Sequence, residues 1–220
     1  MTEIPTAISP RPKLKGIVHA LGACVFFPLI LDMHEMAATA GLRQGVVIYG
    51  CGLIGLLSVS AVYHGLPWPP GLRRHLRRLD RAMIYVLIAG TMTPICCAFN
   101  GIIPNWFLQF IWICAAAGII LSIGWPEAPK RYLSLCYVVF GLISLGLVPT
   151  LILACGPLPV ILLVLGGFVY IIGAIIYVRE KPNLFVGTFE YHELFHTLVV
   201  FAAYLHFKAI EQVCFVVGPQ

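Results

Sequence analysis

The sequence predicts an all-α integral membrane protein, folded as one bundle of seven transmembrane helices. Three observations predict this class. Hydrophobic residues make up 60% of the 220 residues and charged residues only 10%, whereas charged residues are about 25% of an ordinary soluble domain. Apolar residues form continuous runs and do not alternate with polar ones, which favours helices over a β-barrel. Clusters of Pro and Gly separate the runs, as expected where helices end.

Seven stretches are long enough to cross a hydrocarbon core of about 30 Å, which takes about 20 helical residues. We place them at 16–37, 44–64, 81–99, 105–124, 131–153, 157–178 and 192–214. Residues 1–220 are therefore expected to form a single membrane domain. Pro28, Pro94 and Pro149 fall inside predicted spans, where we expect kinks because proline removes a backbone hydrogen bond.

The basic residues predict the orientation of this bundle. Twelve of the 14 Lys and Arg residues lie before the first span or in the connections after the second, fourth and sixth spans. Arg43 lies on the other side, and Lys208 falls inside the last span. Because Lys and Arg accumulate in cytoplasmic loops, we expect a cytoplasmic N-terminus and an external C-terminus. The five arginines between residues 73 and 81, interleaved with leucines, predict a short amphipathic helix on the cytoplasmic surface.

Composition also excludes several classes of protein. The net charge of +5 is explained by the membrane topology, so no nucleic acid partner is expected. The eight Cys residues form no C-x-x-C pair, and a disulfide framework is not expected. The first apolar run is long enough to remain as a span and the segment before it is short and basic, so we expect no cleavable secretory signal.

Polar residues from distant parts of the chain fall at one predicted depth. His64 closes the second span, Asp80 opens the third and His192 opens the seventh, all at predicted cytoplasmic ends. His192 and His196 are four residues apart, so both rings project from one face of a helix, and Ser60 and His64 repeat this spacing. Three imidazoles are costly to bury in a membrane unless something binds them. The pattern therefore predicts a metal site.

The residue types favour zinc and hydrolytic chemistry. Catalytic zinc takes three protein ligands and leaves a position for water, and His64, His192 and His196 supply that number. Zinc lowers the pKa of its bound water to about 7. We expect Asp80 to accept the proton of this water, and Ser60 to hydrogen-bond the water or a substrate oxygen.

Each of these residues also has a simpler interpretation. A His pair at the start of a helix is often interfacial and solvated. Asp80 lies between Arg78 and Arg81 in sequence and can form an interfacial ion pair. Ser60 can hydrogen-bond its own helix backbone, as Ser commonly does in membranes. Only the convergence of all the polar residues at one depth favours a shared site.

Two further histidines need separate interpretations. His19 lies near the cytoplasmic end of the first span, where it can border the site or simply be a packed, hydrogen-bonded side chain. His206 lies ten residues beyond His196. At 1.5 Å per residue it is about 15 Å farther across the membrane, so we do not expect it to share the same metal.

An ordered set of motifs extends through most of the chain, from His19 to His206. It comprises Ser60-Ala61-Val62-Tyr63-His64, Leu79-Asp80-Arg81-Ala82-Met83-Ile84-Tyr85, Ala89-Gly90-Thr91-Met92-Thr93-Pro94 and His192-Glu193-Leu194-Phe195-His196. This set resembles the hemolysin III family, within the progestin and adipoQ receptor superfamily, which is related to the alkaline ceramidases. The resemblance implies seven spans with a cytoplasmic N-terminus. It also implies a multi-pass protein of the bacterial plasma (inner) membrane.

The resemblance also implies roles for individual residues. The family pattern implies zinc bound by His64, His192 and His196, with Asp80 contacting the zinc-bound water and Ser60 beside it. Better-understood members of the superfamily are similar to zinc hydrolases that cleave lipid amides such as ceramide. We therefore expect a lipid substrate and zinc-dependent hydrolysis of an amide or ester. The chain lacks the long N-terminal domain of receptor members, so hormone reception is not expected.

Three alternatives remain open at this stage. In the first, zinc is structural and the protein is a non-enzymatic membrane regulator or receptor. The second is the cytolysin implied by the family's name, although a toxin delivered through water would have to shield seven apolar spans. The third is an intramembrane metalloprotease, because residues 192–196 match the H-E-x-x-H signature in which Glu193 would be the general base. The aspartate expected as third ligand in such a protease would come from an Asp-Gly motif, which this chain lacks.

Overall fold

A computed structural model describes residues 16–217 of the chain, and its regular elements are all helical. The helices are α1 (Ile17–Met36), α2 (Ala40–Gly65), α3 (Pro70–Ala98), α4 (Asn105–Gly124), α5 (Lys130–Leu142), the 3-10 helix η1 (Ile143–Leu147), α6 (Val148–Cys155), α7 (Pro157–Arg179) and α8 (Tyr191–Val217). With α5, η1 and α6 taken as one span, seven helices in this part of the chain are long and apolar enough to cross a membrane. The predicted fold class is confirmed.

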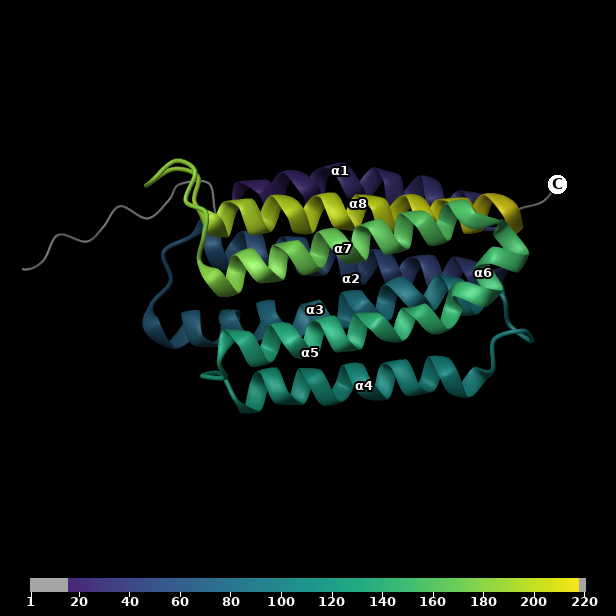
Figure 1. The fold of residues 1–220 in the computed structure, drawn as a ribbon, viewed down its shortest axis with the longest axis horizontal. Coiled ribbons are helices and arrows are strands. Elements are labelled where there is room, and N and C mark those ends of the chain that lie inside the picture. The colour runs from purple at the N-terminus through teal and green to yellow at the C-terminus, as the bar shows by residue number, and fades with distance from the viewer. Residues whose placement is uncertain (1–15, 218–220) are drawn as a thin grey trace, which may run out of the picture.

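The helices lie side by side along the long axis of a bundle, as Figure 1 shows. α3 occupies the middle, where it contacts α2, α4, α5 and α8, and it is the most buried of the seven spans. α1 and α8 pack against each other and α1 also packs against α2, so the first two helices and the last one are neighbours. This arrangement brings together helices that are far apart in sequence.

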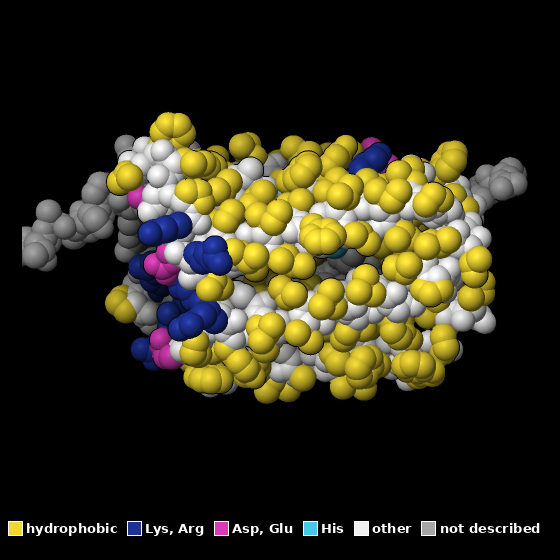
Figure 2. Space-filling model, viewed as in Figure 1, with side chains coloured by type: hydrophobic (Ala, Val, Ile, Leu, Met, Phe, Trp, Pro, Cys, Tyr) yellow, Lys and Arg dark blue, Asp and Glu magenta, His cyan; other side chains and the backbone are white. Residues whose placement is uncertain are grey.

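The outer surface of the bundle is apolar along most of its length. Large hydrophobic side chains such as Leu21, Ile120 and Phe168 are at least 60% exposed, and Leu153 is 88% exposed. Figure 2 shows that such side chains cover nearly the whole visible face between the two ends. A contiguous apolar surface of this extent is unfavourable in water and suits contact with lipid chains.

The structure corrects the predicted start of the third span. The sequence favoured a separate surface helix for residues 72–79 followed by a span from 81, but α3 is one continuous helix from Pro70 to Ala98. The physical reason is local. Pro70 is favourable in the first turn of a helix, and residues 72–89, which join the basic segment to the apolar one, contain neither Gly nor Pro. Asp80 consequently lies almost three turns into α3, at about 3.6 residues per turn, and not at its start.

The three prolines inside predicted spans differ in their effects. α1 continues through Pro28 and α3 continues through Pro94. In the fifth span, by contrast, the α-helix ends at Leu142, and η1 precedes the short helix α6 that contains Pro149. Because proline has no N–H to donate, the tighter hydrogen bonding of η1 in the turn before it accommodates the missing bond.

One end of the bundle carries most of the described basic side chains, which gather at the left of Figure 2. Several of them are paired across helices: Arg77 hydrogen-bonds Glu127 at 2.7 Å and Lys130 hydrogen-bonds Glu180 at 2.5 Å. The basic residues Arg11, Lys13 and Lys15, which also entered the orientation prediction, lie outside the described residues. The charge asymmetry agrees with the expected topology, and the cytoplasmic location of this end stays a prediction.

Candidate metal centre

Three helices bring the predicted site residues to the basic end of the bundle. α2 ends there with His64 in its last turn, and α8 begins there with His192 and His196 in its first two turns. α3 passes the same place and carries Asp80. Figure 1 shows the end of α2 and the beginning of α8 at the same end of the molecule.

The three imidazoles form one compact cluster. One nitrogen from each of His64, His192 and His196 lies within 4.8 Å of the others. The Nε2 atoms of His64 and His192 are 3.4 Å apart, and the ring centroids of His64 and His196 are 4.8 Å apart. The His196 ring is buried, whereas the other two are partly exposed. The structure thus joins residues separated by 128 positions in sequence.

The cluster has the donor set and the spacing that a metal ion requires. Neutral imidazole is a common ligand of zinc, and three protein ligands are typical where zinc is catalytic. Two nitrogens, each about 2.0–2.1 Å from a tetrahedral zinc, are separated by about 3.3–3.4 Å. The observed Nε2 separation of 3.4 Å fits this geometry and is longer than an ordinary hydrogen bond of about 2.7–3.2 Å. His64, His192 and His196 could therefore hold a metal ion together.

Asp80 and Ser60 lie beside this cluster. The Asp80 Oδ2 atom is 3.8 Å from His64 Nε2, the same nitrogen that faces His192, and the Asp80 side chain is 20% exposed. Ser60 is buried, and its side chain interacts with the Asp80 carboxylate. Arg81 donates its hydrogen bond to the carbonyl of Pro126 at 2.7 Å. The ion pair that the structure records for Asp80 therefore joins it to the cluster.

Glu193, which would be the general base of a metalloprotease, is completely buried. Its Oε2 atom accepts the backbone N–H of Glu190 at 2.9 Å. Glu190 immediately precedes α8 and Glu193 is the third residue of the helix, which is the position from which Glu satisfies the open N–H of a helix start. The contact assigns Glu193 a helix-capping role.

The structure adds one residue to the neighbourhood of the site. His19 of α1 is 2% exposed, and both of its ring nitrogens lie within 3.0 Å of His196 Nδ1. Sequence reasoning left open whether this histidine bordered the site. The sequence offered one signal for a buried position of His19. It lies three residues before Gly22, and both residues are on the buried face of α1.

His206 is separate from the cluster, as its position in sequence predicts. Its Nε2 lies 3.1 Å from the carbonyl oxygen of Leu163 in α7, and its ring packs edge-on against Tyr170 with 5.3 Å between centroids. The described metal-binding group does not include it. This histidine is satisfied by a backbone acceptor deeper in the bundle.

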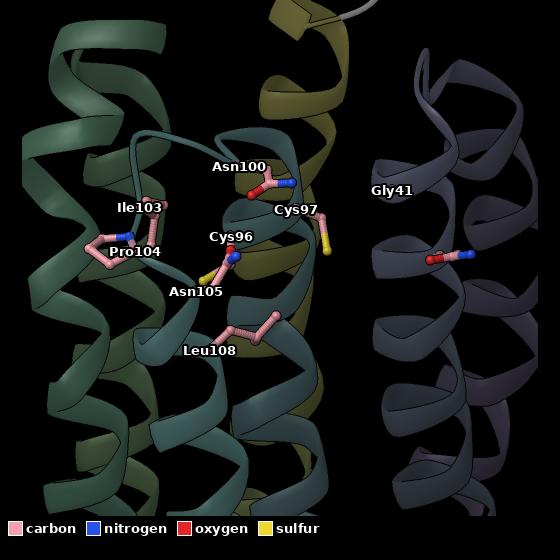
Figure 3. Close-up of a pocket in the computed structure, with 9 residues that line it drawn as sticks. Gly41, Cys96, Cys97, Asn100, Ile103, Pro104, Asn105 and Leu108 are labelled. Atoms are coloured by element: carbon pink, nitrogen blue, oxygen red, sulfur yellow. The ribbon is translucent and has the colours of Figure 1, made fainter.

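A cavity among the described residues lies at the opposite end of the bundle. It measures about 240 Å³ and is enclosed by the start of α2, the end of α3 and the start of α4. Figure 3 shows Cys96, Cys97, Asn100 and Asn105 around it. Because α2 runs from this cavity to His64, the cavity and the histidine cluster are separated by the length of that helix.

Known proteins resemble this chain over most of its length. The family model described as Haemolysin-III related matches residues 9–207. Hemolysin-3 of Bacillus cereus is 30% identical over 188 residues, which cover 82% of this chain and 85% of that protein. The Hemolysin-3 homolog of Bacillus subtilis is 27% identical over 189 residues, covering 84% and 85%. The human Monocyte to macrophage differentiation factor is 30% identical over 194 residues, covering 81% and 74%.

These matches agree with the structure. The matched region contains every residue of the histidine cluster together with Ser60 and Asp80. Seven helices of membrane-spanning length and composition occur in the described residues, so this is a multi-pass membrane protein. The resemblance found in the motifs is thereby confirmed, and the chain belongs to the haemolysin-III related family.

Proposed function

We propose that this protein is a zinc-dependent membrane hydrolase that cleaves an amide or ester bond of a lipid. We place it in a bacterial plasma membrane with the histidine end toward the cytoplasm. One observation carries the proposal: three imidazoles suited to a metal converge next to a carboxylate, with Asp80 Oδ2 only 3.8 Å from His64 Nε2. A structural metal site needs the imidazoles, but it does not need the adjacent carboxylate.

His64, His192 and His196 would hold the zinc. When bound, zinc polarises a carbonyl oxygen and makes a water molecule acidic near neutral pH. Three protein ligands leave a position open for exchange with solvent or substrate. The partial exposure of His64 and His192 agrees with access to that position from one side, while the buried His196 closes the other side.

Asp80 would move the proton that hydrolysis requires. Its carboxylate accepts a proton from the attacking water and then delivers it to the leaving nitrogen of an amide or the leaving oxygen of an ester. Ser60 interacts with this carboxylate and would orient it. The Ser60 hydroxyl could also hydrogen-bond the water or a substrate oxygen, as expected from the sequence, because it has one donor and two acceptor lone pairs.

The location of the site supports a lipid as substrate. The cluster lies in the last turn of α2 and the first turns of α8, toward the end where basic side chains replace the apolar surface in Figure 2. We expect this end to lie at the depth of the lipid linkage groups of a bilayer. A lipid placed there keeps its chains against the apolar exterior and presents its amide or ester bond near the histidines. Anionic headgroups would meet the basic side chains of the same end.

A second candidate function is a non-enzymatic regulator in which zinc links α2 to α8. Two cavities of the described residues both lie around residues 100–105, at the end opposite the histidines. A structural metal needs only ligands that join the two helices and no substrate cavity beside them. The two functions differ in whether the carboxylate of Asp80 is used.

The decisive experiment compares zinc content with lipid hydrolysis. Zinc-loaded protein in detergent micelles is incubated with ceramide as the amide probe and phosphatidylcholine as the ester probe, and released fatty acid is measured. Asp80→Asn should retain zinc and lose about 10²–10⁴-fold in turnover, the usual contribution of a general acid–base. Asp32→Asn is the matched control, because Asp32 is an exposed residue of α1 and undergoes the same change of charge.

Two results would contradict the proposal. Turnover by Asp80→Asn equal to that of the wild type would remove the role of Asp80 in proton transfer. Zinc-loaded wild-type protein that releases no fatty acid from either probe would favour the structural role of zinc.

A further inference from the structure

We propose that His19 is a positioning residue that orients His196 for metal binding, through a hydrogen bond between His196 Nδ1 and the His19 ring. The inference rests on the metal site of the proposed function and is independent of whether lipid hydrolysis occurs. It assigns a role to α1, the one helix of the α1, α2 and α8 group that contributes no imidazole to the metal cluster.

The contact between the two rings is close and buried. His196 Nδ1 lies 2.9 Å from His19 Nε2 and 3.0 Å from His19 Nδ1, and the ring centroids are 4.0 Å apart. Each residue is 2% exposed. Water therefore does not compete for this hydrogen bond, and in such surroundings a lost partner leaves a buried polar nitrogen unsatisfied.

His19 is a polar residue on an otherwise apolar buried face of α1, so it needs a hydrogen-bond partner there. The buried residues of α1 are His19, Gly22, Phe26, Ile30 and Met33, and His19 is the one with a polar side chain. The rest of this face packs in an apolar cluster with α2 and α8. A polar side chain on a buried apolar face is costly unless it is hydrogen-bonded, and the recorded partner of His19 is His196.

Two glycines hold the ring in position. A Cβ atom at Gly16 would lie 2.7 Å from the carbonyl oxygen of Ala61 and 2.7 Å from the Cα of Gly65, so α1 touches the backbone of the last turns of α2. A Cβ atom at Gly22 would lie 3.3 Å from Val200 of α8. Gly16 and Gly22 are three residues on either side of His19 and share its face. The close approach of α1 to both neighbours leaves the His19 ring little freedom.

The chemistry of metal-binding histidines gives this contact its function. A ligating imidazole binds the metal through one ring nitrogen and donates the N–H of the other to a neighbour, which fixes the tautomer and the ring orientation. The usual acceptors are a carboxylate, a carbonyl or water. Here Oε2 of Glu193, the nearest carboxylate in sequence, accepts the N–H of Glu190, and the recorded contact of His196 Nδ1 is the His19 ring. A neutral His19 can accept the Nδ1–H of His196 without adding charge to a buried site.

The experiment measures metal affinity and coordination and needs no turnover. Zinc dissociation constants are determined by competition with a chromogenic chelator for the wild type, His19→Leu and His19→Gln in detergent. His19→Leu should bind zinc about 10–100-fold more weakly, the usual effect of removing such a neighbour. His19→Gln should recover part of the loss, because the amide oxygen can accept the same N–H. Cobalt-substituted His19→Leu should keep three imidazole ligands but show shifted absorption bands.

The matched control is His206→Gln. His206 is another histidine inside the bundle and is partly buried, but its partner is the Leu163 carbonyl, so zinc affinity should stay within about twofold of the wild type. Thermal unfolding of the zinc-free proteins checks folding. If His19→Leu does not fold, His19→Ala, which also lacks an acceptor, replaces it in the comparison with His19→Gln and His206→Gln.

Three results would overturn the inference. Unchanged zinc affinity in both His19 variants would show that the contact does not orient His196. Loss of one imidazole from the cobalt complex of His19→Leu would make His19 a ligand. A wild-type protein that binds no zinc would overturn the metal site and this role together, whereas a zinc-binding protein without lipid turnover leaves the role of His19 intact.

Discussion

The two ends of the bundle are built by the same helices and differ in chemistry. At the basic end, the end of α2 and the start of α8 bring three imidazoles together beside Asp80. At the other end, the start of α2 and the end of α3 enclose a cavity of about 240 Å³ lined by amide and thiol side chains such as Asn100 and Cys96. The basic end holds the candidate metal ligands, and the lining of the cavity at the other end contains no carboxylate and no imidazole.

This difference shows why the size of a cavity does not locate a functional site. Metal binding depends on donor atoms at fixed separations. Three rings that lie a few ångströms apart leave enough space for the ion. A cavity gains function only from the groups that line it. The functional argument therefore concerns the basic end, and the following tests ask whether the ends are as independent as their chemistry indicates.

The largest expected effect is loss of the metal at the basic end. His64→Ala removes one of three ligands, and zinc measured by elemental analysis should fall from about one per chain to nearly none. His34→Ala is the matched control, because His34 is in the last turn of α1, toward the other end of the bundle, and should leave zinc unchanged. Equal zinc content in wild type and His64→Ala would exclude the cluster as the metal site.

A smaller effect is expected from crowding the helices far from the histidines. A Cβ atom at Gly45 would lie 2.7 Å from the Cα of Pro94. The backbone of α3 at Pro94 cannot easily move to relieve this contact. Gly45→Ala should therefore lower the free energy of unfolding by about 1–3 kcal/mol, measured by thermal or denaturant unfolding in detergent. Zinc content should not change if the ends are independent.

Gly41→Ala is the control for that substitution. No atom lies within 4 Å of a Cβ at Gly41, so its stability should be equal to that of the wild type or slightly higher. If Gly45→Ala kept its fold and lost zinc, the two ends would be coupled through α2.

The smallest effect is expected at Glu193. Gln can replace Glu in the reciprocal cap of a helix start, so Glu193→Gln should retain zinc, stability and any turnover of the lipid probes. Glu193→Ala removes the bond to Glu190 and should lower the free energy of unfolding by about 0.5–2 kcal/mol. Cleavage of a membrane peptide by the wild type that is lost in Glu193→Gln with zinc still bound would instead support Glu193 as the general base of a metalloprotease.

Much of this fold follows from the sequence because transfer of an apolar residue into lipid depends mainly on the residue itself. The seven runs of about 20 residues therefore predicted the spans closely, with α4 at Asn105–Gly124 as expected. The start of α3 was missed because arginines are unfavourable in hydrocarbon but compatible with a helix that extends beyond it. Hydropathy locates the membrane segment of a helix and does not locate its first residue.

The histidine cluster was predictable for a similar reason. The spacing of His192 and His196 puts both on one face, and the topology puts His64 at the same depth. The His19 contact was not predictable, because it depends on the rotation of α1 about its own axis. That rotation is set by the close packing at Gly16 and Gly22, which only the assembled bundle reveals.

The division of the cluster between α2 and α8 has a consequence for synthesis. The His64 codon is translated 128 residues before that of His192, an interval of roughly 6–26 s at typical bacterial elongation rates of about 5–20 residues per second. Throughout that interval the nascent chain carries a single imidazole of the set. Loading of the ion is thereby deferred until the final helix is inserted, and a ribosome that stalls earlier releases a product unable to capture it.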